Sequence, residues 1–129
     1  HILPILKGTT VDFLNSDEVK HNVFSPDKIA DKFNLGTYGK GVKRSHTFDK
    51  VGVAVILCNV HTEMEAYIVV LPTPFFAMTD GDGNFRIENV HPGEYTIKTW
   101  HEKMREVSQN IRVEPGKITE LNIVLKRRR

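Results

Sequence analysis

The sequence predicts an all-β protein, a sandwich or a barrel, and three observations lead to that prediction. Short runs rich in valine, isoleucine, phenylalanine and tyrosine recur along the chain, and several alternate apolar with polar residues. Clusters of glycine, proline, aspartate and asparagine separate these runs at intervals of roughly 8–12 residues, as in sandwiches and barrels. No long stretch carries the periodicity of an amphipathic helix.

Six strands are predicted in the first half of the chain. Pro4 favours an edge position for the first of them. The fifth is a continuous apolar run, long enough for one buried strand. Residues 25–32 are predicted as a loop with room for a helical turn. Residues 33–41 are predicted as a loop with short extended pieces, because they contain three glycines. The strands are residues 2–7, 11–15, 19–24, 43–48, 53–58 and 66–71.

A boundary is predicted at Pro72-Thr73-Pro74, which divides the chain into domains 1–72 and 73–129. The second domain is small, so its core would be marginal alone. Its segment Asp80–Asn84 looks like a fragment of a calcium loop, but without a later glutamate and flanking helices a tight turn is favoured. The expected strands of this domain are residues 75–79, 85–87, 94–100, 107–113 and 118–125.

Composition and charge narrow the class of protein. Hydrophobic residues make up 40% and charged residues 26%, with a net charge of +2, as in an ordinary globular protein. Basic residues do not interleave with aromatic ones, which argues against a nucleic-acid partner. No apolar run is long enough for a transmembrane span. The basic run Lys126–Arg129 is interpreted as a solvated tail rather than a phosphate-binding or acidic-partner site.

The chemistry of the chain is concentrated in a loop after the fifth strand. Cys58, His61 and Met64 lie within seven residues, and His21 on an earlier β segment is the best candidate for a second imidazole. Each has an ordinary alternative: an inert buried thiol, a surface histidine, a core methionine. The joint arrangement, a cysteine ending a strand with histidine and methionine at fixed spacing, favours a metal site.

The donor types favour copper. A trigonal set of two imidazoles and one thiolate with a weak axial thioether is typical of electron-transfer copper sites. Zinc prefers four strong tetrahedral ligands, and only three of these donors are of that kind. Glu63 inside the loop is an alternative oxygen ligand, which would make the copper more open and reactive; Met64 has the better spacing.

These residues resemble the cupredoxin family of blue-copper proteins. The Cys-x-x-His-x-x-Met loop is similar to the short ligand loop of the amicyanins, and His21-Asn22 within 17–24 is similar to the segment of the first ligand. Residues 7–15 match the strand pattern before it, and residues 48–52 match the turn before the cysteine strand. The resemblance covers about residues 2–71 and implies a Greek-key β-sandwich.

The whole chain is similar to bacterial cupredoxin-like proteins often labelled methylamine utilization proteins. In these, a cupredoxin part continues into a small carboxypeptidase-regulatory-like, prealbumin-like β-sandwich lobe. The segments that carry this resemblance are residues 73–76, 79–85, 91–95 and 100–102. The label does not establish methylamine oxidation.

The resemblance implies that His21, Cys58, His61 and Met64 are the ligands of one type 1 copper ion. It assigns Asn22 to a supporting role, linking the two ligand loops through its side chain. It also implies a periplasmic or otherwise extracytoplasmic location. In this family the ligand that corresponds to His61 protrudes through an apolar surface patch, for which the expected residues here are Val60, Leu35 and Tyr38.

The chain departs from the family at its beginning. Cupredoxins usually have another strand before the position of Ile2, and this first strand is missing from the chain, which starts at His1. An unpaired sheet edge is a liability. We therefore expect another chain or element to dock at this N-terminal edge.

The leading functional hypothesis is electron transfer with unknown redox partners, as a soluble carrier or as a subunit of a larger redox assembly. Three alternatives remain open: a copper-handling protein, a copper enzyme acting on a small molecule such as a nitrogen oxide, and a structural subunit of an assembly. No acid–base pair or substrate pocket is evident in the sequence, so an enzyme is disfavoured.

Overall fold

The computed structural model describes residues 1–15, 21–25, 33–58 and 65–128. These residues form nine strands and no helix, so the predicted all-β class is confirmed. No helix among them is of the length and apolar character needed to cross a membrane. The helical turn expected within 27–32 lies outside the described residues.

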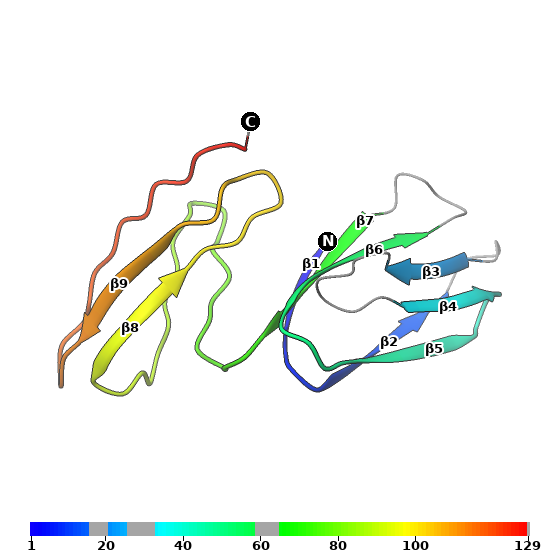
Figure 1. Ribbon diagram of the computed structural model, residues 1–129, viewed down its shortest axis with the longest axis horizontal. Coiled ribbons are helices and arrows are strands. Elements are labelled where there is room, and N and C mark those ends of the chain that lie inside the picture. The colour runs from blue at the N-terminus through cyan, green and yellow to red at the C-terminus, as the bar shows by residue number, and fades with distance from the viewer. Residues whose placement is uncertain (16–20, 26–32, 59–64, 129) are drawn as a thin grey trace. The chain divides into compact units, whose positions relative to one another are not determined.

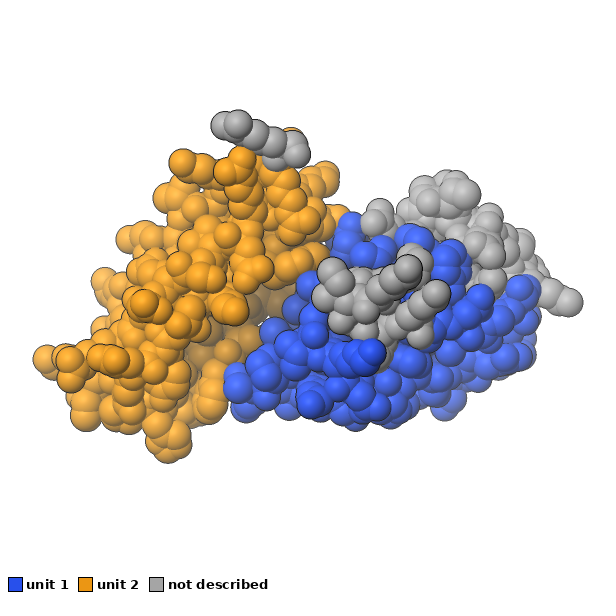
Figure 2. Space-filling model, viewed as in Figure 1, with its two compact units in different colours: residues 1–74 blue, residues 75–129 orange. Residues whose placement is uncertain are grey.

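The chain divides into two compact units, His1–Pro74 and Phe75–Arg129, here called unit 1 and unit 2 (Figure 2). Each is described by itself.

Unit 1 consists of a five-stranded sheet and a two-stranded sheet (Figure 1). The order in the larger sheet is β1-β7-β6-β3-β4, with β1 parallel to β7 and the other neighbours antiparallel. The smaller sheet is the antiparallel pair β2 and β5. The strands are β1 (Ile2–Leu6), β2 (Thr9–Leu14), β3 (His21–Ser25), β4 (Phe33–Tyr38), β5 (Lys43–Phe48), β6 (Gly52–Cys58) and β7 (Glu65–Leu71).

The core of unit 1 forms because alternate residues of its strands are apolar and point to one face of each sheet. Phe48 and Ala54 are fully buried, and Val11 and Phe13 of β2 pack against the cluster. Burying this apolar surface is the main force that holds the two sheets together. The buried cluster is Ile5, Phe48, Ala54, Ile56, Ile68 and Val70.

The chain passes from one sheet to the other at Lys7 and Gly8. The Lys7 amide donates to the Leu71 carbonyl oxygen of the larger sheet at 2.9 Å, and the next amide, Gly8, donates to the Phe48 carbonyl oxygen of the smaller sheet at 2.7 Å. Gly8 has a φ of 90°, in the region that favours glycine. This abrupt change of partner is what places β1 and β2 in different sheets.

Pro4 lies on β1, the edge strand of the larger sheet, with its backbone groups directed away from the neighbouring strand β7. The Tyr67 amide donates to the His1 carbonyl oxygen, and the Lys7 amide donates to that of Leu71. Since alternate residues of a parallel strand direct their backbone groups to the same neighbour, Pro4 directs its nitrogen away from β7. The missing N–H therefore costs no bond to β7, and the predicted edge position of this proline is confirmed.

At residues 33–41 the prediction of a loop with short extended pieces underestimated the extended part, because residues 33–38 form one continuous strand, β4. The local sequence lacks apolar alternation and contains Gly36, whose φ is 76°. What makes the segment a strand is antiparallel pairing with β3, with Tyr38 opposite His21 and Phe33 opposite Ser25. Such pairing with the preceding strand is not visible in the local periodicity of residues 33–41.

Unit 2 contains the antiparallel hairpin of β8 (Gly93–Lys98) and β9 (Ser108–Val113). The other three strands expected in this part, residues 75–79, 85–87 and 118–125, are not strands in the structure. None of the described residues of unit 2 is fully buried, and its apolar side chains are at best half-buried. Apolar segments bounded by turns were therefore not enough to form ladders here.

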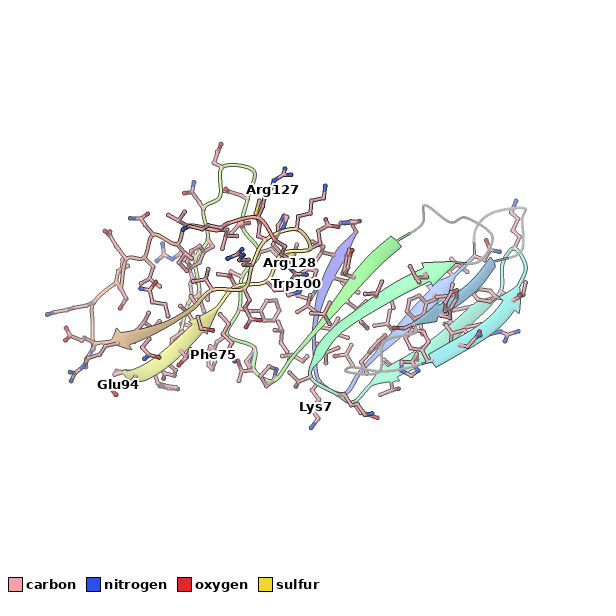
Figure 3. All side chains as sticks on the ribbon, turned by 45° about the horizontal axis from the view of Figure 1, so that its top comes forward. Lys7, Phe75, Glu94, Trp100, Arg127 and Arg128 are labelled. Carbon is pink, nitrogen blue, oxygen red and sulfur yellow. The ribbon has the colours of Figure 1, made fainter. Side chains whose placement is uncertain are left out.

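The basic run Lys126–Arg129, interpreted as a solvated tail, is exposed in its described part, but its backbone is also hydrogen-bonded to another segment of unit 2. Arg105 donates its amide to the Lys126 carbonyl oxygen at 2.8 Å, and Arg128 donates its amide to that of Lys103 at 3.0 Å. The Arg128 side chain also donates through Nε to the Met104 carbonyl oxygen at 2.9 Å. Figure 3 shows Arg127 and Arg128 on this segment. Backbone pairing thus holds the end of the chain against residues 103–105.

The segment Asp80–Asn84 is a tight turn, as expected. Asp80 accepts hydrogen bonds at Oδ1 from the amides of Asp82 and Asn84, both at 2.9 Å. Its own amide donates to the Asn84 carbonyl oxygen at 2.9 Å, which closes the turn. The carboxylate is thus used to stabilise the backbone.

Candidate metal centre

The two predicted ligands that lie within strands, His21 and Cys58, are on neighbouring strands of the larger sheet. β3 begins at His21 and β6 ends at Cys58. The antiparallel register pairs Val23 with Cys58 and Phe24 with Leu57. The beginning of β3 and the end of β6 therefore lie at the same end of the sheet, where these two inner strands begin and end (Figure 1).

The other predicted ligands, His61 and Met64, lie outside the described residues, as does the alternative ligand Glu63. For His21, Asn22 and Cys58 the structure describes the backbone and not the side chain. Asn22 is opposite Thr37 in the pairing of β3 with β4. The set of four ligands and the supporting role of Asn22 remain predictions.

Within the described residues, no group of three or more His, Cys, Asp or Glu side chains is placed to hold a metal ion. His46 stacks on Phe33, with ring centroids 4.1 Å apart, as part of the aromatic packing in unit 1. His101 accepts the Lys103 amide at Nδ1 at a distance of 2.9 Å. These two histidines therefore have structural contacts of their own.

A hydrogen-bonded group that the sequence did not reveal lies beside the beginning of β3. Asn15, only 4% exposed, donates from Nδ2 to the Tyr38 carbonyl oxygen at 3.0 Å. The Asn15 amide donates to the Val42 carbonyl oxygen at 3.2 Å, and the Gly41 amide donates to that of Asn15 at 2.8 Å. Asn15 thus joins the end of β2 to the end of β4 and to the turn after it. The sequence signals were a polar residue closing an alternating strand and its place at the end of the family's strand pattern over residues 7–15.

Arg44 of β5 reaches the same region from the smaller sheet. Its Nη1 donates to the Leu35 carbonyl oxygen at 3.0 Å, and its guanidinium carbon lies 5.5 Å from the centroid of the Tyr38 ring. A cation over an aromatic face is attracted by the ring's negative face. Arg44 therefore links β5 to β4 by two contacts.

The expected apolar surface patch is wrong in one of its members. Tyr38 is only 4% exposed and so is not a surface residue. The physical reason is that β4 is a strand of the larger sheet, with Arg44 lying over the tyrosine ring. Leu35 is half-buried, and Val60 lies outside the described residues.

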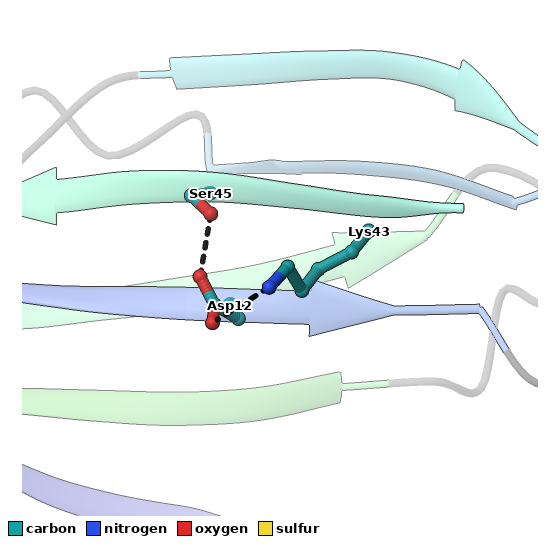
Figure 4. A network of polar contacts seen from close by, with 3 residues as sticks. All are labelled: Asp12, Lys43 and Ser45. Carbon is teal, nitrogen blue, oxygen red and sulfur yellow. Dashed lines mark hydrogen bonds and ion pairs between the residues drawn. The ribbon is translucent and has the colours of Figure 1, made fainter. Parts of the chain in front are cut away.

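Three polar side chains, Asp12, Lys43 and Ser45, interact with one another on the pair of β2 and β5 (Figure 4). Asp12 accepts a 2.5 Å hydrogen bond from the Ser45 hydroxyl and lies 3.6 Å from the Lys43 ammonium. The hydrogen bond, followed by the charge of Lys43, lowers the pKa of Asp12 below its usual value of 3.8. Both favour the ionised carboxylate.

Residues 52–126, more than half of the chain, match the carboxypeptidase regulatory-like domain family. The matched range begins in unit 1, at the start of β6, and extends through most of unit 2. No curated protein matches the chain.

Several solved structures are similar to the chain. A purple cupredoxin from Nitrosopumilus maritimus is 32% identical, over 54% of this chain and 77% of that one, with a TM-score of 0.49. A variant of amicyanin in the Cu(I) form is 25% identical, over 54% and 69%, also with a TM-score of 0.49.

A Cu-containing nitrite reductase from Thermus scotoductus SA-01 is 28% identical and has a TM-score of 0.52. The similarity covers 56% of this chain but only 19% of the nitrite reductase chain. This all-β chain, with cupredoxins among its structural neighbours, belongs to the carboxypeptidase regulatory-like domain family.

Proposed function

We propose that this protein binds one copper ion through His21, Cys58, His61 and Met64 and acts in electron transfer. It would serve as a soluble carrier or as a subunit of a larger redox assembly. The observation that carries the proposal is the antiparallel pairing of β3 with β6. It brings the backbones of His21 and Cys58 to the same end of the larger sheet. A site with ligands from both segments needs such an arrangement.

The chemistry of the four proposed donors fits a copper ion. A thiolate and a thioether suit Cu(I), whereas imidazoles also suit Cu(II), so the same set of ligands tolerates both oxidation states. A bound copper ion would supply one-electron redox chemistry. The residues of this chain would hold the ion and keep their geometry as the charge changes, and Asn22 would help to orient them.

The likeness to the Cu-containing nitrite reductase supports a copper protein, because that similarity combines a TM-score of 0.52 with 28% identity. A closer kinship with the cupredoxin-like methylamine utilization proteins is part of this proposal, without the activity in their label. An extracytoplasmic location, such as the periplasm, is part of it as well.

Titration of the metal-free protein with Cu(II) tests the proposal. We expect an intense visible thiolate-to-copper absorption band that saturates at one equivalent. Cys58→Ser should abolish the band, because serine supplies no thiolate. Zn(II) added in place of copper should give no visible band, because it has no redox or d-electron transitions.

Weak, colourless copper binding by the wild-type protein would contradict the electron-transfer proposal. It would leave the copper-handling alternative, in which exposed and exchangeable ligands pass the metal on. The sequence disfavours that alternative, because a cysteine at the end of an apolar strand is suited to a preorganised site.

A second candidate function is the conversion of a nitrogen oxide at an open copper ion, and the similarity to a nitrite reductase is the observation that favours it. Cyclic voltammetry of the copper-loaded protein separates the two. Electron transfer predicts a reversible wave that nitrite leaves unchanged. A catalytic current on addition of nitrite would establish the enzyme instead, and Glu63→Gln would then test the alternative ligand.

A further inference from the structure

We infer that Asn15 is a positioning residue that holds the beginning of β3, and with it His21, through the backbone of Tyr38. This inference rests on the proposed function in one respect: it takes His21 as a copper ligand. The geometric part of the inference stands on described residues alone.

The position of His21 depends mainly on β4. In the pairing of β3 with β4, His21 is opposite Tyr38 and Asn22 is opposite Thr37. The described pairing with β6 begins further along, at Val23. A register shift between Asn22 and Phe24 separates the beginning of β3 from the rest of its ladder with β4. Since a bulge disrupts the ladder locally, Tyr38 becomes the nearest fixed reference for His21.

Tyr38 is held in turn by Asn15. Both residues are 4% exposed, and the hydrogen bond from Asn15 Nδ2 to the Tyr38 carbonyl oxygen measures 3.0 Å. Asn15 itself is anchored on both sides by backbone bonds to Val42 and Gly41. Leaving a buried carbonyl oxygen without its donor costs more free energy than leaving an exposed one, because water cannot replace the donor. Loss of this single bond should therefore have a large structural effect.

Arg44 provides a second restraint on Tyr38 from the smaller sheet. Its guanidinium lies over the tyrosine ring and donates to the carbonyl oxygen of Leu35, three residues earlier on β4. Because Arg44 is itself exposed, its replacement should leave the core intact. Asn15 and Arg44 therefore fix β4 from two sides at the point where it pairs with His21.

Hydrogen exchange of the metal-free protein tests the geometric part. In Asn15→Ala we expect the amides of His21 and Asn22 to exchange faster relative to the amide of Val70 in β7, by on the order of tenfold. Arg44→Met should have a smaller effect in the same direction. If Asn15→Ala does not fold, Asn15→Asp takes its place, because a carboxylate of nearly the same size cannot donate to the Tyr38 carbonyl oxygen.

Copper loading tests the functional part. With Cu(II) bound, Asn15→Ala and Arg44→Met should shift the visible bands and the copper hyperfine splitting in the electron paramagnetic resonance spectrum. Asn34→Ala is the matched control. It removes the 2.8 Å bond that Asn34 Oδ1 accepts from the Gly36 amide, at a different place on β4, and should leave the copper spectrum unchanged.

The outcomes separate this inference from the proposed function. Normal copper spectra and normal exchange in both variants would overturn the inference and leave the proposed function standing. A wild-type protein that does not bind copper would overturn the proposed function, while faster exchange at His21 in the metal-free variants would still support the positioning by Asn15. Equal spectral changes in Asn34→Ala would overturn the specific role of Asn15.

Discussion

Asp12 links a local hydrogen bond to the behaviour of the protein in acid. Its pKa is lowered first by the hydrogen bond from Ser45 and then by the charge of Lys43. The contact with Lys43 joins two largely exposed side chains, with 60% and 52% of their surfaces accessible, so salt screens it and its contribution is small. The hydrogen bond from Ser45 is therefore the main source of the shift.

This shift predicts a pH dependence with a definite sign. A carboxyl group with a lowered pKa in the folded state stabilises the protein above its unfolded pKa, and this contribution is lost as the pH falls through the folded value. We expect Asp12→Asn to lower the melting temperature slightly at pH 7, and the difference from wild type to shrink below about pH 4. Thermal unfolding followed between neutral and acidic pH measures it.

Asp49→Asn, at an exposed carboxylate in the turn between β5 and β6, is the control for the loss of a charge. A difference between Asp12→Asn and wild type that stays constant with pH would show that the Asp12 contacts do not contribute in this way.

At the level of single residues, the sequence identified side chains by their chemistry and not by their surroundings. Positions 21, 58, 61 and 64 were predicted as donors because thiol, imidazole and thioether groups occur together there at the spacing of a copper-binding loop. Asn15 was missed because its importance comes from Tyr38, a residue on a different strand. Tyr38 was placed on the surface for the same reason: its burial depends on β3, β4 and Arg44 together.

At the level of elements, Phe48 at the end of β5 is the residue on which the packing of the two sheets most depends. It is 0% exposed, and its ring lies 5.6 Å from that of Phe33 and 4.8 Å from that of His46, centroid to centroid and edge to face. Such edge-to-face pairs add to the energy of burial.

We expect Phe48→Ala to lower the free energy of unfolding by about 3–5 kcal/mol, because it removes a large buried side chain and leaves a cavity. Urea denaturation followed by circular dichroism measures this change. Val51→Ala, at a side chain that is 48% exposed, should stay within about 0.5 kcal/mol of wild type. Equal effects of the two substitutions would show that the core is not centred on Phe48.

The elements that were predicted well have a strong local signal. The strands expected at 43–48, 53–58 and 66–71 agree with β5, β6 and β7 to within a residue. β-Branched residues are frequent in β6 and β7, and predicted turns or loops delimit all three strands. β4 was not recognised as a full strand because Gly36 and the two glycines after the strand are typical of loops, and the pairing with β3 that forms it leaves no mark on the local sequence. In unit 2, residues 118–125 are rich in apolar residues but form no ladder. Their described link to the hairpin includes a side-chain bond, from the Thr119 hydroxyl to the Arg112 carbonyl oxygen at 2.9 Å.

At the level of the whole molecule, the edge strand β1 is where we propose that a partner docks. Leu3 and Leu6 are 46% and 40% exposed, and the alternation of backbone groups along β1 directs the Pro4 carbonyl away from β7. An exposed apolar edge of this kind can accept a further strand, although Pro4 has no backbone N–H to donate to it.

Leu6→Pro tests this proposal without breaking the bonds of β1 to β7, because Leu6 is also an outward-facing position. It removes an outward donor and should therefore weaken association of the purified protein, measured by analytical ultracentrifugation, while the circular dichroism spectrum stays unchanged. A wild-type protein that sediments as a monomer over the whole concentration range would contradict docking of a second copy at this edge.

Copper K-edge X-ray absorption of the protein loaded with one equivalent of Cu(II) tests the central claim most directly. The ligands proposed at 21, 58, 61 and 64 predict one short copper–sulfur distance together with two copper–nitrogen distances typical of imidazole. In Cys58→Ser the short copper–sulfur distance should be lost. A wild-type spectrum that contains only oxygen and nitrogen neighbours would contradict the account.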